Sequence, residues 1–315
     1  DTRPIRILLF ISMLVGLVMA AAIPYAFTYR GLIFAVCYVL IQAGRTLYII
    51  GVLGDHHLAA NFKRIMGWFC ISAVFWITGA ILQGEWQILL WIIAAICDYT
   101  APMHGFALPR LGRSDSSKEW TIEGHHLVER CQLFVIIAFG ETLLMTGASL
   151  SEVEEWTPLV IISAVICLAM WWVYFDVSSE AGSRKIQEVK DPGKLGLIYN
   201  AIHIVLVGAL IICAVGDELI VAHPEQEMRA EVVFVLIIGP IVYILANSIY
   251  KYVTCRMLPL SHIIAVIALA LLLPWPYHIS LLTMNILVTS VFIFVIVFDM
   301  LFPNKGFKIK WEPKI

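Results

Sequence analysis

Three ionisable residues are spaced along one apolar stretch so that a single helix face would carry all of them. His126, Arg130 and Glu141 lie within residues 124–149, which are otherwise mostly apolar. Their intervals are close to one and three helical turns, so an imidazole, a guanidinium and a carboxylate line up on one face of a helix. Glu129, next to Arg130 in the sequence, lies beside this face. Groups of these types in a membrane helix usually pair with one another or mark an ion or proton route.

The element that holds these residues is long enough to cross a bilayer. About 26 residues at a rise of ~1.5 Å cover ~39 Å, against a hydrocarbon core of ~30 Å. A carboxylate inside a membrane helix costs ~2.5–3.5 kcal/mol on insertion scales, so we expect Glu141 to face protein, water or a partner charge. The stripe could line a proton or ion route, which we favour for Glu141. The alternative is that it joins helices by salt bridges, and for Glu129 and Arg130, at headgroup depth, this structural role is at least as good an explanation.

The composition is that of a polytopic membrane protein. Of the 315 residues, 61% are hydrophobic and 14% are charged, whereas soluble chains carry about 25% charged residues. The seven cysteines fall in or beside apolar stretches, with no CxxC pair. We expect them to be reduced and buried, and neither a disulfide framework nor a metal site is indicated.

Ten apolar segments separate along the chain and predict an all-α bundle of about ten transmembrane helices. All except the ninth are long enough to span, and the ninth ends at Pro274 and Pro276. Very short links join the third to the fourth and the ninth to the tenth, so each pair should form an antiparallel hairpin. The segments are residues 5–24, 31–53, 64–83, 86–108, 125–149, 157–178, 195–222, 231–252, 260–273 and 277–302.

Loop charges predict the orientation of these helices. Seventeen lysines and arginines fall in the termini and loops on one side, while Arg30 and Arg229 alone fall on the other, beside acidic residues such as Glu152 and Glu225. Basic residues favour the cytoplasmic side, so both ends of the chain should be cytoplasmic, in the inner membrane.

The chain also repeats itself. Residues 1–113 resemble the later part of a second block, residues 121–302, which a cytoplasmic tail of residues 303–315 follows in a single transmembrane domain. The matched pairs are Gly16 with Gly208, Phe34 with Phe234, Asp98 with Asp299 and Pro102 with Pro303. The pattern predicts a six-plus-six architecture with parallel halves, in which we expect a further helix pair before Asp1.

Two further charged residues lie in the first block. Arg45, flanked by Gln42 and Tyr48, needs an acidic partner or a lipid phosphate, and Asp98 is the natural candidate. Pro102 cannot donate to the carbonyl of Asp98, which leaves a carbonyl beside a carboxylate. This arrangement suits a cation, and it equally suits an ordinary kink filled by water.

His203 and Asp176 complete the set of candidates. His203, with Tyr199 and Asn200, forms a polar patch, although a lone membrane histidine is more often a packing residue than a ligand. Asp176 follows Trp171, Trp172 and Tyr174, which are best explained as the aromatic belt at the cytoplasmic interface.

One segment resembles a known family. HLVERCQLFVIIAFGE at residues 126–141 is similar to the HLxERFGLFxIIxLGE signature of bacterial low temperature requirement A (LtrA) proteins, with Cys131 and Gln132 in place of Phe-Gly. WWVYFD at residues 171–176 resembles a later family segment. Members usually open with a helix pair carrying a Glu-Leu-Phe-Phe-Asp motif, which would supply the pair that the repeat requires. The resemblance implies an integral membrane protein linked by name to growth in the cold, and it supplies no biochemical activity.

The leading functional hypothesis is a transport protein, a channel or carrier, that moves a small ion or solute past a charged helix face. The alternative is a lipid- or small-molecule-binding membrane protein, a sensor or an enzyme, whose charged stripe anchors a headgroup. No HExxH, GxSxG, P-loop or Rossmann pattern occurs in a suitable context, so an enzyme function has no supporting motif. Membrane lipids are the expected partners, no nucleic acid is indicated, and cofactor and oligomeric state stay open.

Overall fold

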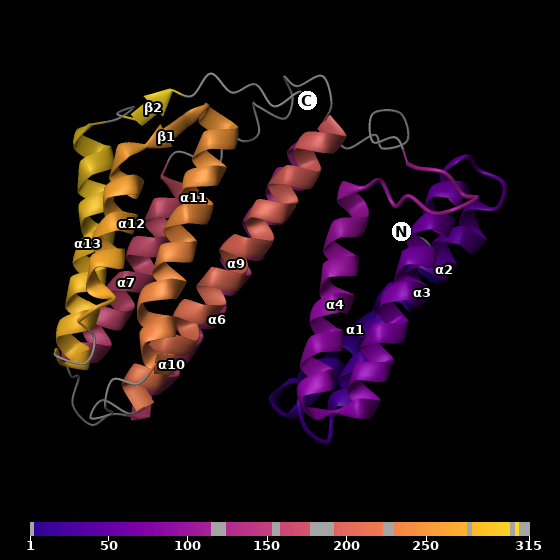
Figure 1. The fold of residues 1–315 in the computed structure, drawn as a ribbon, viewed down its shortest axis with the longest axis horizontal. Helices are drawn as coiled ribbons and strands as arrows, with labels where there is room; N and C mark the ends of the chain where they lie inside the picture. The colour runs from indigo at the N-terminus through magenta and orange to yellow at the C-terminus, as the bar shows by residue number, and fades with distance from the viewer. Residues whose placement is uncertain are drawn as a thin grey trace. The chain divides into compact units, whose positions relative to one another are not determined.

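The computed structural model is an all-α protein, which confirms the predicted fold class. It describes residues 3–114, 124–152, 158–176, 192–222, 230–275, 279–302 and 306–308. This part of the chain is 86% helical and holds ten helices when the continuous helical run 230–255 is counted once (Figure 1). Each coincides with one of the ten apolar segments, because a continuous apolar run in a membrane can satisfy its backbone polar groups within a helix.

Seven of the described helices are long and apolar enough to cross a membrane. They are α1 with the short turn η1, α2, α3, α4, α9, the joined η2 and α11, and α13. Two shorter apolar stretches lie at Ile161–Phe175, in α7, and at Leu260–Leu272, which is α12. The short α12 agrees with the expectation for the ninth segment, which stops before Pro274.

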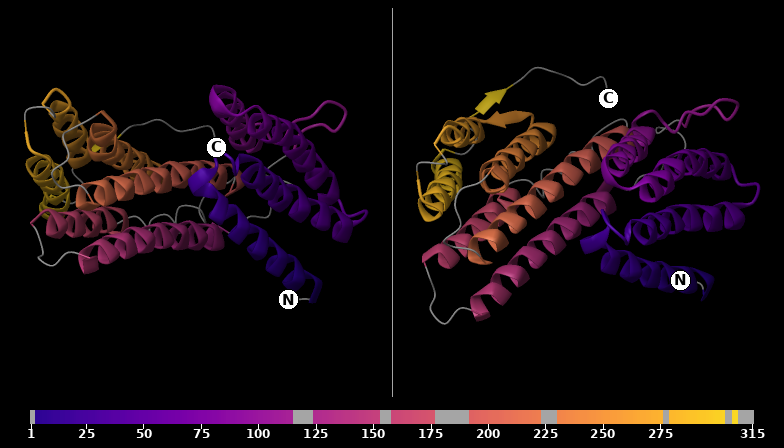
Figure 2. Two further views of the ribbon diagram at one scale, coloured as in Figure 1. Left: turned by 90° about the horizontal axis from the view of Figure 1, so that it is seen from below. Right: turned by 60° about the horizontal axis from the view of Figure 1, so that its bottom comes forward.

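The chain divides into two compact units, Asp1–Thr121 and Ile122–Ile315. Unit 1 holds four helices that pack successively, each against the next (Figure 2). They are α1 (Arg3–Ala22, continued by η1, Ile23–Tyr25), α2 (Gly31–Leu53), α3 (Leu58–Leu82) and α4 (Gly84–Met103).

The tightest connection in unit 1 is the hairpin between α3 and α4. Gln83 alone separates the helices, and both Gln83 and Gly84 have positive φ, at 56° and 58°. These positive φ angles turn the chain within one residue and bring the two helices into contact. A Cβ at Gly79 would lie 2.8 Å from Cδ1 of Trp91, so only glycine permits this close approach.

A second contact ties α4 to the connection between η1 and α2. The amide of Gln87, fully buried, donates to the carbonyl oxygen of Ala26 at 2.7 Å. Phe34, Trp76 and Trp91 pack around this point and form the aromatic core of unit 1.

Unit 2 holds the larger core. In it, α6 packs on α9, α9 on α11, α7 on α13, and α11, α12 and α13 pack in succession. The elements are α6 (Gly124–Glu152), α7 (Pro158–Phe175), α9 (Pro192–Ala222), α10 (Ala230–Val233), the π-helical η2 (Phe234–Ile238), α11 (Gly239–Cys255), β1 (Met257–Pro259), α12 (Leu260–Leu272), α13 (Leu281–Leu301) and β2 (Gly306–Lys308).

Backbone conformation and side-chain capping mark the end of α11 and the start of α13. Arg256 adopts the left-handed conformation, with φ of 58°, and ends α11. Ser280 caps α13 by accepting a hydrogen bond from the backbone N–H of Thr283 at 3.2 Å. The short strands β1 and β2 pair antiparallel, so the segment before α12 is bonded to the segment after α13.

Candidate functional site

The predicted charged stripe on α6 lies on the face that points away from the core of unit 2. Val128, Cys131, Val135 and Phe139 are buried and form the opposite face, which packs into the core. His126, Arg130 and Glu141 are all exposed in this unit. The helical periodicity that predicted a common face therefore also describes the observed packing.

Two of the predicted residues on α6 contact each other. Nδ1 of His126 lies 3.4 Å from the Glu129 carboxylate, one turn along the exposed helix end. Glu141 is different, because within the described residues it makes no hydrogen bond or ion pair. Its neighbours on the exposed face include the apolar side chains Leu144 and Ile137, which are 71% and 67% exposed.

The predicted partnership of Arg45 with Asp98 is wrong within the described part of unit 1. Asp98 instead accepts two neutral hydrogen bonds at Oδ2, from the Tyr38 hydroxyl at 2.9 Å and the Trp76 indole N–H at 3.1 Å. The Arg45 guanidinium donates to Gln42 at 3.2 Å, and the Gln42 amide lies 3.5 Å from the Tyr38 hydroxyl. Tyr38 and Gln42 therefore occupy the positions between the two charges and link them indirectly.

The second carboxylate oxygen of Asp98 is buried without a hydrogen-bond partner in the structure described. Pro102, four residues on, lies inside α4 and does not end it, since the helix continues to Met103. The Asp98 carbonyl still lacks the N–H that a residue other than proline would supply.

His203 is a buried packing residue that uses both ring nitrogens. Nδ1 lies 2.8 Å from the carbonyl oxygen of Tyr199, which can only accept, so Nδ1 carries the proton. Nε2 therefore accepts from the Tyr174 hydroxyl, also at 2.8 Å. The Tyr199 and Tyr250 hydroxyls are 2.8 Å apart and complete a network across α7, α9 and α11.

This network corrects one prediction for the end of α7. Trp171 and Trp172 are about two-fifths exposed, as an aromatic belt requires, whereas Tyr174 is 1% exposed and belongs to the core. The hydrogen bond to His203 explains its position, since a buried hydroxyl needs a partner. Asp176 follows the last helical residue and is exposed, apart from the other candidates.

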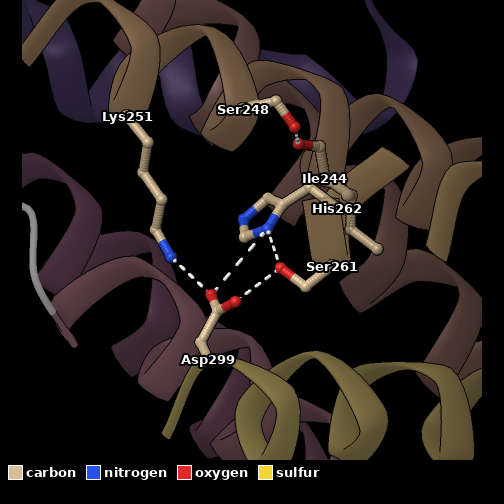
Figure 3. Close-up of polar contacts among 6 residues, drawn as sticks. All are labelled: Ile244, Ser248, Lys251, Ser261, His262 and Asp299. Carbon is tan, nitrogen blue, oxygen red and sulfur yellow. Dashed lines mark hydrogen bonds and ion pairs between the residues drawn. The ribbon is translucent and has the colours of Figure 1, made fainter. Parts of the chain in front are cut away.

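The described part of unit 2 contains a charged cluster around Asp299, which the sequence indicated only as the repeat counterpart of Asp98 (Figure 3). Nζ of Lys251 on α11 lies 3.0 Å from Oδ2 of Asp299 on α13. Ser261, on α12, donates to Oδ1 of Asp299 at 2.5 Å, and its Oγ is 3.1 Å from Nδ1 of His262. We call Lys251, Ser261, His262 and Asp299 the Asp299 cluster.

The Asp299 cluster is almost closed to solvent. The side chains of Lys251, Asp299 and His262 are 8%, 17% and 0% exposed. Because Ser261 gives its only hydroxyl proton to Asp299, its oxygen accepts from Nδ1–H of His262. Nε2 of His262 is buried and has no hydrogen-bond partner in the structure described.

A second polar site that was not predicted from the sequence is a buried carboxylate toward the opposite end of unit 2. Asp217, near the end of α9, is 8% exposed and interacts with Ser163 of α7. Asn285 of α13 donates to Ser163 at 3.3 Å, so three helices meet at this polar point. In the sequence, the feature that could have indicated this site is an aspartate inside the seventh apolar segment, residues 195–222.

Comparison with known proteins gives a family but no activity. The family described as "Bacterial low temperature requirement A protein (LtrA)" matches residues 1–297. An uncharacterized protein of Rhizobium meliloti (strain 1021) is 36% identical over 272 residues, which cover 84% of this chain and 66% of that relative. The chain thus spans just under two thirds of that relative's length. No solved structure matches the chain.

Proposed function

This chain belongs to the bacterial low temperature requirement A family, and we propose that it is a membrane transport protein, a channel or carrier that moves a small ion or solute. Its apolar helices support the membrane location. The transport proposal rests on Glu141, a carboxylate in the second half of α6 that has no partner among the described residues of its unit. α6 is not among the seven helices that are long and apolar enough to cross a membrane, so its place at a membrane-crossing route is part of the proposal.

The position of Glu141 bears on the choice between a route and a structural salt bridge. A carboxylate facing hydrocarbon is unfavourable by ~2.5–3.5 kcal/mol at the centre of the membrane, so this face of α6 must meet water or protein. Arg130 cannot neutralise it directly, since eleven residues of helix separate them by ~16 Å. The contacts within the described part of unit 2 thus leave the charge available to a passing ion.

The second candidate function is the binding of a lipid or another amphipathic molecule. The same face of α6 exposes Leu133, Phe134 and Ile137, so it offers apolar surface beside the charges. Such a surface suits a ligand with an ionic head and an apolar tail. A binding protein would retain a lipid through purification, and a transport protein would pass an ion.

The membrane orientation is part of the proposal. The excess of basic residues in one set of loops favours cytoplasmic termini for this chain, in the inner membrane. In that orientation the Asp299 cluster lies toward the cytoplasmic end of α13.

The test is flux through vesicles that contain the purified protein. K⁺, Na⁺ and H⁺ are tried in turn as the permeant ion, and Glu141→Gln, which keeps the shape and removes the charge, is compared with the unmodified protein. The matched control is Glu85→Gln, an exposed carboxylate in the first turn of α4. We expect at least a tenfold change in flux for Glu141→Gln alone. Equal flux for a folded Glu141→Gln protein would refute the route.

A further inference from the structure

We propose that the Asp299 cluster is a proton-binding site, in which a proton bound at Nε2 of His262 displaces Lys251 from Asp299. The site goes beyond the proposed transport function, since nothing in it requires flux. In the structure Lys251 contacts the carboxylate, and we assign this arrangement to the proton-free state, in which the imidazole is neutral (Figure 3).

The first observation is the free lone pair of His262. Its Nδ1–H is engaged with Ser261, whose own proton goes to Asp299, so Nε2 is the unprotonated nitrogen. Nε2 is fully buried and without a hydrogen-bond partner among the described residues. A buried acceptor left unpaired is unfavourable, and in a native structure it calls for an explanation such as a role in proton binding.

The second observation is the arrangement of charge around that nitrogen. Nδ1 of His262 lies 3.9 Å from Oδ2 of Asp299, the same oxygen that Lys251 contacts at 3.0 Å. The Asp299 carboxylate thus lies near two basic groups, the Lys251 ammonium and the His262 imidazole. With Lys251 in place, its charge balances Asp299, so a second positive charge on His262 would have no counterion.

Protonation of His262 therefore requires Lys251 to withdraw. The imidazolium then takes over Asp299, both directly and through Ser261, and the buried charge stays balanced. Lys251 can leave because it lies one helical turn before Cys255, the last residue of α11, and a long lysine side chain near a helix end extends readily to the aqueous interface.

In the three helices α11, α12 and α13, the charged side chains beside His262 are Lys251 and Asp299; Arg256 follows α11 directly. α11 contributes Lys251, α12 contributes Ser261 and α13 contributes Asp299. η2 and β1 are apolar in sequence, and β2 contains Lys308, which pairs with Met257 through the backbone. The competition is thus between Lys251 and His262 for one carboxylate.

The chemical step is a simple proton transfer. A hydronium ion gives its proton to the Nε2 lone pair, one N–H bond forms, one O–H bond breaks, and water remains. No oxidant, metal or cofactor takes part.

Solid-state NMR of the full chain in lipid vesicles tests this proposal without any transport assay. The ring nitrogens of histidine and the Lys251 Nζ to Asp299 Cγ dipolar coupling are recorded from mildly alkaline to mildly acidic pH. Signals are assigned with His262→Gln and His203→Gln. We expect His262 to change from the Nδ1–H form to the doubly protonated form, with loss of the Lys251 to Asp299 coupling over the same pH range.

His203 serves as the control in the same sample. It is as deeply buried as His262, but both of its nitrogens are already bonded, to Tyr174 and Tyr199. Its spectrum should stay constant over that range. The proposal is overturned if His262 stays neutral wherever the protein is folded, or if it becomes protonated while the Lys251 to Asp299 coupling persists.

Discussion

The hydroxyl of Tyr174 lies 2.8 Å from Nε2 of His203 and joins α7 to α9 inside the core of unit 2. The rings meet edge to face, and Tyr174 also stacks on Tyr250 of α11. Three helices are thus held together by one aromatic group whose polar atoms are paired.

Tyr174→Phe should lower the free energy of unfolding by ~1–3 kcal/mol, because it leaves Nε2 of His203 buried without its donor. Unfolding by denaturant in detergent micelles measures the loss. Tyr29→Phe removes a hydroxyl from a ring that is 66% exposed and should be nearly neutral. Equal effects from both substitutions would contradict the importance of the buried hydrogen bond.

The Lys251 and Asp299 pair should behave as a buried ion pair. Lys251→Met should lower stability by ~3–5 kcal/mol, since it leaves Asp299 buried without its counterpart. Asp299→Asn should lower stability by less, because Lys251 can then extend to the aqueous interface. The double variant should lose less than the sum of the two. For comparison, Glu129→Gln removes the partner of exposed His126 and should cost under ~1 kcal/mol. Additive losses at Lys251 and Asp299 would show that the pair is not coupled.

Gly79 should tolerate no larger side chain. Gly79→Ala places a Cβ 2.8 Å from the Trp91 indole, and we expect a loss of ~1–3 kcal/mol from overpacking. Gly44→Ala, with nothing within 4 Å of the added Cβ, should be neutral or slightly stabilising. The tryptophan fluorescence of folded Gly79→Ala should also shift. An unchanged spectrum and unchanged stability would mean that α3 and α4 are further apart than the structure shows.

The proposed orientation predicts where added cysteines react. In a variant that lacks the native cysteines, Glu154→Cys should react with an impermeant thiol reagent only from outside the cell. Lys190→Cys should react only from the cytoplasmic side. Both positions lie outside the described residues, so the loop charges alone carry this prediction. Reaction of both from one side would exclude the topology.

The helices were predictable because their signal is local. Each apolar run ends at polar or helix-breaking residues, and every predicted segment contains one observed helix. The main boundary error is the start of α3, predicted at residue 64 and found at Leu58. α3 extends beyond its apolar run at this end, and Asn61 in the extension is 1% exposed because it packs there.

The candidate sites were only partly predictable, because polar partners are chosen by packing. The α6 stripe follows from periodicity within one helix. Lys251 resembled an ordinary loop charge in the sequence, and its partner lies 48 residues away. Asp98 likewise takes its donors from two other helices and not from the nearest arginine. The six-plus-six repeat that relates Asp98 to Asp299 stays a prediction.

The pairing of β1 with β2 has a mechanical consequence for α12 and α13. The strand before α12 and the strand after α13 are joined in a fixed register, from Met257 with Lys308 to Pro259 with Gly306. One helix cannot slide along the other without breaking these backbone hydrogen bonds. At the end of α13 that carries Asp299, this pairing therefore opposes movement of the two helices along each other.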